Sequence, residues 1–104
     1  MKKKLQRAWA KALRSGEFKQ GKNKLQNFGK YCCLGVLCKI ADIKITLFQD
    51  LLYSSQLKLV GLDDKDQREL AGLNDGEYND GVCINPALTF EEIALFVENL
   101  PTDD

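Results

Sequence analysis

A basic, glycine-containing stretch from residue 14 to residue 24 holds the side chains with the clearest chemical potential in this sequence. Cations and glycine backbone amides can together hold the oxygens of an anion such as phosphate. Two flanking aromatic residues offer faces on which a base can stack. The candidate ligand-binding residues are Trp9, Arg14, Ser15, Lys19, Gln20, Gly21, Lys22, Lys24 and Tyr31. We expect a site for a small anionic ligand there, near the start of a central helix whose N-terminal end favours an anion.

The same residues also fit a purely structural interpretation, in which a solvated basic loop lies beside a tryptophan that anchors the core. The sequence does not distinguish the two interpretations. Residues 16–22 also match the first part of a P-loop, G-x4-G-K. A P-loop continues with Ser or Thr and follows a strand. Asn23 stands at that position, and a helical pattern precedes Gly16. We interpret the match as chance.

Four cysteines raise the question of a metal or a disulfide: Cys32, Cys33, Cys38 and Cys83. Adjacent cysteines bridge each other poorly, and the chain has no histidine to complete a mixed zinc site. Free cysteine inside an apolar run behaves as a small hydrophobe. We expect Cys33 and Cys38 to be reduced and buried, and we expect no metal and no cofactor.

An enzyme is the least favoured class of function. Without histidine the chain has no imidazole base. Burial of cysteines in an apolar run raises their pKa and makes them poor nucleophiles. The acidic residues at 63–66 and 91–92 occupy the positions of helix caps, which explains them without an acid–base pair.

The run from Tyr31 to Asp42 is the densest apolar segment and predicts a helix buried on most sides. Apolar residues at helical spacing predict a second helix over residues 2–14, with Gly16 ending it in a left-handed conformation. Gly35 inside the central helix suggests close approach by another segment, because glycine costs about 1 kcal/mol there relative to alanine.

The other segments have weaker patterns. We expect an irregular hairpin over 17–30 with its turn at Gly21–Asn23, and two short helices over 47–62, the second capped by Ser54 or Ser55. Asp63 is placed to cap a helix over 63–73, and residues 82–84 can form a short strand. A capping box begins at Thr89 and opens the last helix, over residues 90–99.

These elements predict a mainly α fold, that is, α+β with at most a small β-hairpin. We expect a single domain over residues 1–104, a compact bundle of about five short helices around the buried central helix 31–42. No apolar run is long enough for a membrane span, and the basic start lacks the continuous apolar stretch of a secretory signal. We therefore expect a cytoplasmic protein with no membrane partner.

Charge is unevenly distributed although the net charge is zero. Residues 1–30 carry ten Lys or Arg and one acid, whereas residues 61–104 carry twelve acids and two bases. This asymmetry suggests an anionic partner for the first third of the chain. Mutual neutralisation, within one chain or across a homodimer or higher homo-oligomer, explains it equally well.

The chain resembles a family of short bacteriophage and prophage proteins of uncharacterised activity. The resemblance lies in Trp9, LRSG at 13–16, Phe18, QGK at 20–22, YCCLGVLC at 31–38, DQ at 66–67, LAGLND at 70–75 and TFEEIA at 89–94. Residues 76–88 depart from the pattern as an insertion-like stretch. The resemblance implies a phage origin and action in the host cytoplasm, where small accessory proteins often counter host defence.

Three functions follow as hypotheses. The first is a non-enzymatic protein that binds and sequesters a small anionic, nucleotide-derived signalling molecule of host defence. The second is a protein-binding inhibitor that uses its charge asymmetry to mask a host enzyme or defence protein. The third is a nucleic-acid-binding regulator, which zero net charge and the lack of a helix-turn-helix pattern disfavour.

Overall fold

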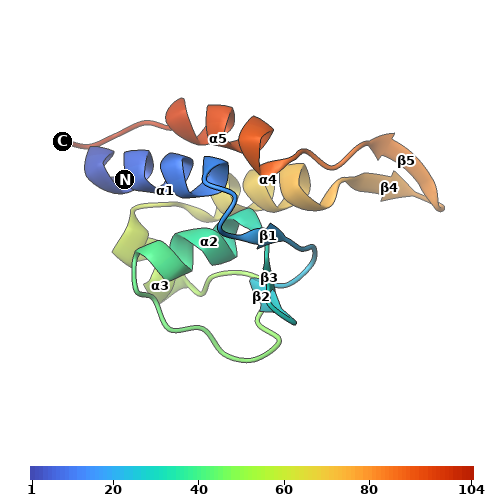
Figure 1. Cartoon of the computed structure of the whole chain (residues 1–104), viewed down its shortest axis with the longest axis horizontal. Coiled ribbons are helices and arrows are strands. Elements are labelled where there is room, and N and C mark those ends of the chain that lie inside the picture. Colours follow the sequence, from blue (N-terminus) through green and yellow to red (C-terminus); the bar gives the residue numbers. More distant parts are fainter.

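Helices α1 (Lys3–Arg14) and α5 (Phe90–Glu98) lie side by side across the top of the computed structural model, which describes residues 1–104 (Figure 1). The helix predicted over 2–14 is confirmed, and Trp9 and Leu13 on its apolar stripe are buried. Gln6 is also buried. Its side-chain amide donates to the carbonyl oxygens of Val97 and Leu100 at 2.9 and 2.7 Å. It therefore ties α1 to the last turn of α5 and to the residue two positions beyond that helix.

Helix α2 (Cys33–Ile40) lies beneath this pair and is the centre of the core, as predicted (Figure 1). All six residues from Cys33 to Cys38 are buried, against α1 on one side and α4 (Asp64–Asp75) on another. Trp9 ties α1 to this helix, because its indole Nε1 donates to the Cys33 carbonyl at 2.9 Å. The observed helix is two residues shorter at each end than the predicted 31–42.

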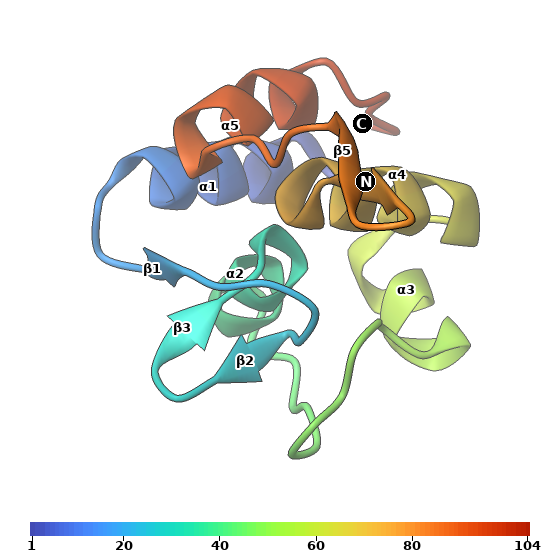
Figure 2. The ribbon, with the colours of Figure 1, turned by 90° about the vertical axis from the view of Figure 1, so that its right-hand side faces the viewer.

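Three two-residue strands flank α2: β1 (Lys19–Gln20), β2 (Gln26–Asn27) and β3 (Lys30–Tyr31) (Figure 2). Strand β3 lies in the middle, parallel to β1 and antiparallel to β2. The hairpin turn is at Phe28–Gly29, where φ is 51° and 77°. The predicted turn at Gly21–Asn23 is wrong, because those residues are tied elsewhere: the Gly21 amide donates to the Tyr31 carbonyl and the Asn23 amide to Asp75.

Residues 41–53 form no helix, so the first of the two helices predicted over 47–62 is wrong. Gln49 explains the irregular path. Its buried side chain accepts from the Thr46 amide at 3.0 Å and donates to the Leu51 carbonyl at 2.8 Å. These local bonds replace helical ones. The second helix is confirmed as α3 (Ser54–Val60), but its capping residue is Tyr53, whose amide donates to Gln56 at 2.8 Å.

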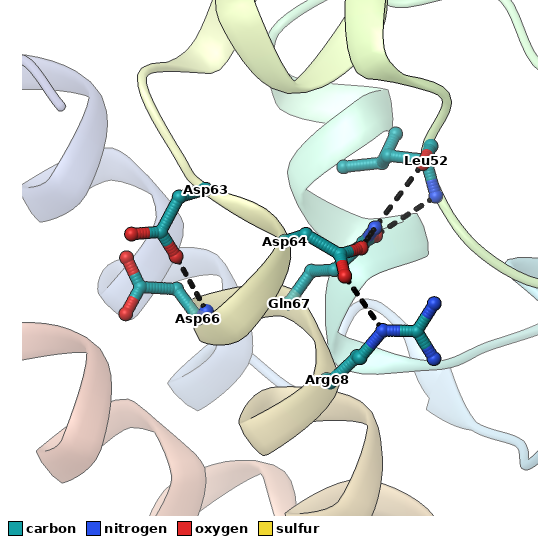
Figure 3. A network of polar contacts seen from close by, with 6 residues as sticks. All are labelled: Leu52, Asp63, Asp64, Asp66, Gln67 and Arg68. Carbon is teal, nitrogen blue, oxygen red and sulfur yellow. Dashed lines mark hydrogen bonds and ion pairs between the residues drawn. The ribbon is translucent and has the colours of Figure 1, made fainter.

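The acidic cluster at 63–66 builds the start of α4 (Figure 3). Asp63 caps the helix, as predicted, by accepting from the Asp66 amide at 2.7 Å. Asp64 accepts from the Arg68 guanidinium, and this bond holds the pKa of Asp64 below its ordinary value. Gln67 exchanges hydrogen bonds with the backbone of Leu52 at 3.0 and 3.2 Å, which joins α4 to the loop before α3. The carboxylates of Asp63 and Asp64 therefore bind groups in the first turns of α4, which accounts for their presence there.

A second small sheet follows α4. Strands β4 (Glu77–Asn79) and β5 (Val82–Asn85) form an antiparallel hairpin that projects from the end of α4 (Figure 1). The strand predicted at 82–84 is therefore confirmed. The capping box at the start of α5 is confirmed too: the Thr89 hydroxyl accepts from the Glu92 amide, and the Glu92 carboxylate accepts from the Thr89 amide.

The predicted mainly helical α+β domain with five helices around a buried central helix is confirmed. All five helices contribute to one apolar core. The strands form two small sheets where the sequence indicated one hairpin and one isolated strand. None of the five helices combines the length and the apolar character that crossing a membrane requires.

Candidate functional site

A large hollow in the surface is a groove along α1 with a volume of about 820 Å³. We call it the α1 groove. One wall is the basic face of α1, and the other is the end of α5 with the segment that follows it. It is lined by Lys3, Gln6, Arg7, Ala10, Lys11, Arg14, Ser15, Glu98, Leu100 and Thr102. Only Ala10 and Leu100 are apolar, so the groove suits a polar occupant.

Four cations line the α1 groove because of their spacing along the helix. Lys3, Arg7 and Lys11 are four residues apart, and Arg14 follows three residues later. Residues three and four apart share one face of a helix. Each step of four advances about 6 Å along the axis, so the row extends over about 16 Å. The groove therefore offers positive charge at several points.

Three of these cations have no carboxylate partner. Lys3, Arg7 and Lys11 are exposed, and none forms an ion pair in the structure. Arg14 forms an ion pair with Glu98 across the groove. This pair fixes the Arg14 side chain at the rim, and the other three side chains remain available to an anion.

The residues predicted to bind a ligand do not form one site. Arg14 and Ser15 line the α1 groove, whereas Gln20 and Gly21 serve the fold. The Gln20 side chain donates to the Leu88 carbonyl at 2.8 Å and accepts from the Phe90 amide at 3.1 Å. It thereby joins β1 to the start of α5.

Asn74 is the polar residue that organises this region, although it was not among the predicted site residues. Its side chain is completely buried at the end of α4. Its oxygen accepts from the Cys33 amide and from Gln20, both at 3.1 Å, and its nitrogen donates to the Gly21 carbonyl at 2.8 Å. The LND segment at 73–75 was the available signal, as part of the resemblance.

The remaining predicted residues are scattered. Trp9 is fully buried, so its ring offers no face to a ligand. Tyr31 is half-buried and meets Phe18 edge to face at 5.2 Å between ring centres, away from the α1 groove. Lys24 forms an ion pair with Asp50. Of the predicted cations in 17–24, Lys19 and Lys22 are exposed and have no ion-pair partner.

The start of α2 does not serve an anion as expected. The Cys33 amide donates to Asn74, and the Gly35 amide donates to the thiol sulfur of Cys32 at 3.4 Å. Both amides are buried among protein atoms. These two amides at the positive end of the helix are thus paired within the protein and are not free to bind an anion directly.

Cys32, Cys33 and Cys38 are free and buried, while Cys83 is exposed. Burial raises the pKa of the Cys32 thiol to about 11 and that of Cys38 to about 12. It also raises the pKa of Cys33 well above its ordinary value. These three thiols are therefore protonated near neutral pH and act as parts of the core. No group of three or more potential ligands is arranged to hold a metal ion.

Three large apolar side chains are exposed together on the loops beneath α2: Phe28, Leu47 and Phe48. We call them the loop patch. Their exposed fractions are 95%, 80% and 65%, and they line a shared hollow of about 380 Å³. Phe28 and Phe48 have φ of 51° and 68°. Bulky residues seldom adopt this region, and such strain is often found at functional positions.

A family model described as "Domain of unknown function (DUF8296)" matches residues 1–50. That segment contains α1, the three-stranded sheet and α2, and hence all four cations of the α1 groove. The comparisons found no match among curated proteins or among solved structures.

Proposed function

We propose that the protein is a non-enzymatic binding protein for a small anionic molecule, which it holds in the α1 groove. The observation that carries this proposal is the row of Lys3, Arg7 and Lys11, three cations without a carboxylate partner along one groove. Its volume of about 820 Å³ falls within the range of about 300–1,000 Å³ found for small-molecule sites.

Phosphate is the anion that best suits this groove. Arg7 can form paired hydrogen bonds with two phosphate oxygens, and lysines add charge without demanding one geometry. Cations about 6 Å apart along the helix favour a ligand that carries more than one phosphate. A nucleotide-derived molecule fits this description. No aromatic residue lines the groove, so recognition rests on phosphates and not on base stacking.

The biological setting in this proposal comes from the sequence resemblance. A phage protein that binds such a molecule in the host cytoplasm can withdraw a nucleotide signal from host defence. Sequestration needs no chemical step and therefore no nucleophile. The three buried thiols are protonated and are poor nucleophiles, which agrees with this role.

Calorimetric titration of the purified protein tests the groove directly. The probes are a cyclic dinucleotide, ATP and inorganic triphosphate. The key variant is Arg7→Gln/Lys11→Gln, which removes two charges and keeps good helix formers. The control is Lys4→Gln/Lys58→Gln, which removes two exposed cations outside the groove. We expect the groove variant to weaken binding of at least one probe by roughly tenfold or more, since charged hydrogen bonds contribute about 1.5–3 kcal/mol each.

Three outcomes would contradict the proposal. Wild-type protein that binds none of the probes has no such site. Equal affinity of groove variant and control places the site elsewhere. A bound nucleotide recovered in hydrolysed form after denaturation contradicts the non-enzymatic part. Stronger binding of single-stranded DNA, with a steep dependence on salt, would favour the nucleic-acid alternative.

The loop patch supports a second candidate, the protein-binding inhibitor. Three exposed apolar side chains on strained turns resemble the apolar centre of a protein interface. Folded variants tested in host cells distinguish the two candidates. If the groove variants still counter host defence and Phe28→Ser/Phe48→Ser does not, we conclude that the protein masks a host protein and does not sequester a ligand.

A further inference from the structure

Glu98 supplies the one carboxylate among the residues that line the α1 groove. It forms an ion pair with Arg14 and with none of the other three cations there. The side chains of Arg14 and Glu98 are 38% and 43% exposed, so a ligand in the groove can reach both of them. Surface ion pairs of this kind contribute little to stability. An anion that binds Arg14 more strongly than a carboxylate does can therefore replace Glu98.

The stability of α5 does not explain why a carboxylate stands at position 98. Glu98 is the last residue of that helix, and no basic residue lies in its last turn. A negative charge is unfavourable there, because the C-terminal end of a helix dipole is itself negative. Arg14, by contrast, lies in the last turn of α1, where a cation is favoured. The carboxylate thus occupies an unfavourable helix end and binds the cation at the end of the basic row.

We propose that Glu98 determines which anions the α1 groove accepts, because a ligand must displace its carboxylate in order to bind Arg14. This inference rests on the proposed function of the groove. A terminal phosphate carries about 1.5–2 negative charges at pH 7, whereas a phosphodiester or a carboxylate carries about one. A terminal phosphate therefore displaces Glu98 from Arg14, and a phosphodiester has no advantage in charge over the carboxylate.

The spacing of the cations lets one ligand use Arg14 together with the free cations. Lys11 and Arg14 are three residues apart, so their side chains are neighbours on the helix surface. Arg7 lies about one turn closer to the start of α1. A ligand whose terminal phosphate binds Arg14 can thus place further phosphates beside Lys11 and Arg7. This arrangement favours linear nucleotides with a terminal phosphate and disfavours cyclic dinucleotides.

Two forms of diadenylate are a matched pair of probes. In the cyclic form both phosphates are phosphodiesters, whereas in the linear form with a 5′-phosphate one of them is terminal. Calorimetric titration gives the ratio of their affinities for the wild-type protein and for each variant. We expect the wild-type protein to bind the linear form roughly tenfold more tightly, since only that form gains a charged hydrogen bond to Arg14.

The variant Glu98→Gln should reduce this preference to about threefold or less, because both ligands can then bind Arg14 without a competing carboxylate. The cyclic form should bind roughly tenfold more tightly than to wild type, while the linear form gains about threefold or less. Simple relief of charge repulsion would instead help the more highly charged linear form and widen the preference. The direction of the change therefore distinguishes displacement of Glu98 from general repulsion.

The matched control is Glu17→Gln, which removes an exposed acid that does not line the groove. This variant should keep the wild-type preference. Arg14→Gln should also remove the preference, but by weakening the linear form, because neither ligand then has an arginine to gain. Circular dichroism of each variant checks that the fold is intact.

Equal affinities of the wild-type protein for the two forms would overturn the inference. So would a preference that Glu98→Gln leaves unchanged or widens, or one that Glu17→Gln reduces as much. If Arg7→Gln/Lys11→Gln weakens binding in that case, the proposed function stands and only the role of Glu98 is wrong. If neither form binds, the inference fails, and ATP and inorganic triphosphate then decide the proposed function by themselves.

Discussion

Asn74 shows how one buried amide joins segments that are far apart in the sequence. Its side chain binds the Cys33 amide at the start of α2, the Gln20 side chain on β1 and the Gly21 carbonyl. Every one of these groups lies in a part of the protein with little access to water, and Asn74 itself is completely buried. A polar network of this kind stabilises a fold only when all its members are paired.

The change Asn74→Ala should lower the free energy of unfolding by about 2–4 kcal/mol. It leaves the Cys33 amide and the Gly21 carbonyl without their partners, and each unpaired buried group costs about 1–3 kcal/mol. Urea unfolding followed by circular dichroism measures the change. Asn27→Ala on exposed β2 is the control and should change stability by less than about 0.5 kcal/mol. Equal effects of the two substitutions would mean that Asn74 does not organise the region.

At the scale of elements, α2 can occupy the centre because Gly35, in its first half, has no side chain. Residues 20–25 cross this helix on their way to β2, and the Leu25 carbonyl lies against Gly35. A Cβ atom at Gly35 would overlap that carbonyl oxygen and the carbonyl carbon. Leu25 is itself fully buried and accepts from the Cys32 amide at 3.3 Å. Burial and this hydrogen bond therefore hold the Leu25 backbone against the helix.

Alanine substitution at two helical glycines should have opposite effects. Gly35→Ala forces the backbone at Leu25 to shift and should destabilise by about 3 kcal/mol or more, beyond the usual cost of overpacking. Gly72→Ala in α4 adds a methyl group where no atom lies within 4 Å, and it should stabilise by about 0.5–1 kcal/mol through helix propensity. Thermal unfolding of both variants checks this. A Gly35→Ala protein as stable as wild type would show that the crossing segment packs loosely.

At the scale of the whole molecule, three thiols in the core make stability depend on alkaline pH. Burial raises the pKa of Cys32 to about 11 and that of Cys38 to about 12, and it also raises the pKa of Cys33. The unfolded chain ionises these thiols near pH 8.5. Above that pH the unfolded state binds fewer protons than the folded state, so the free energy of unfolding falls as pH rises. Below it, this contribution is fully present.

Urea unfolding between pH 8 and pH 10 should therefore show a loss of stability that Cys32→Ala/Cys38→Ala reduces. Each thiol that ionises only on unfolding contributes up to about 1.4 kcal/mol per pH unit to the slope. The double variant is expected to be less stable at every pH because it loses buried atoms, so the slope and not the absolute value is the measurement. Parallel slopes for the two proteins would contradict the buried, protonated state of these thiols.

Most of the local structure could be predicted from the order of the residues alone. Apolar spacing and capping signals predicted α1, α2, α4 and α5, since these depend on contacts between residues three or four apart. They also predicted the close approach at Gly35 and the burial of Cys33 and Cys38. The irregular backbone of residues 41–53 was not predicted. It depends on hydrogen bonds of the Gln49 side chain, which the spacing of apolar residues does not indicate.

Which surface could form a site depends on how distant segments pack together. The sequence grouped Trp9 with residues 14–24 and Tyr31 because they are near one another along the chain. Folding buried Trp9, used Gln20 and Gly21 to join distant elements, and turned Tyr31 toward Phe18. The α1 groove exists only because the end of α5 lies beside the basic face of α1, about 90 residues away in sequence. Spacing within one helix aligned its cations, but packing between two helices made the hollow that they line.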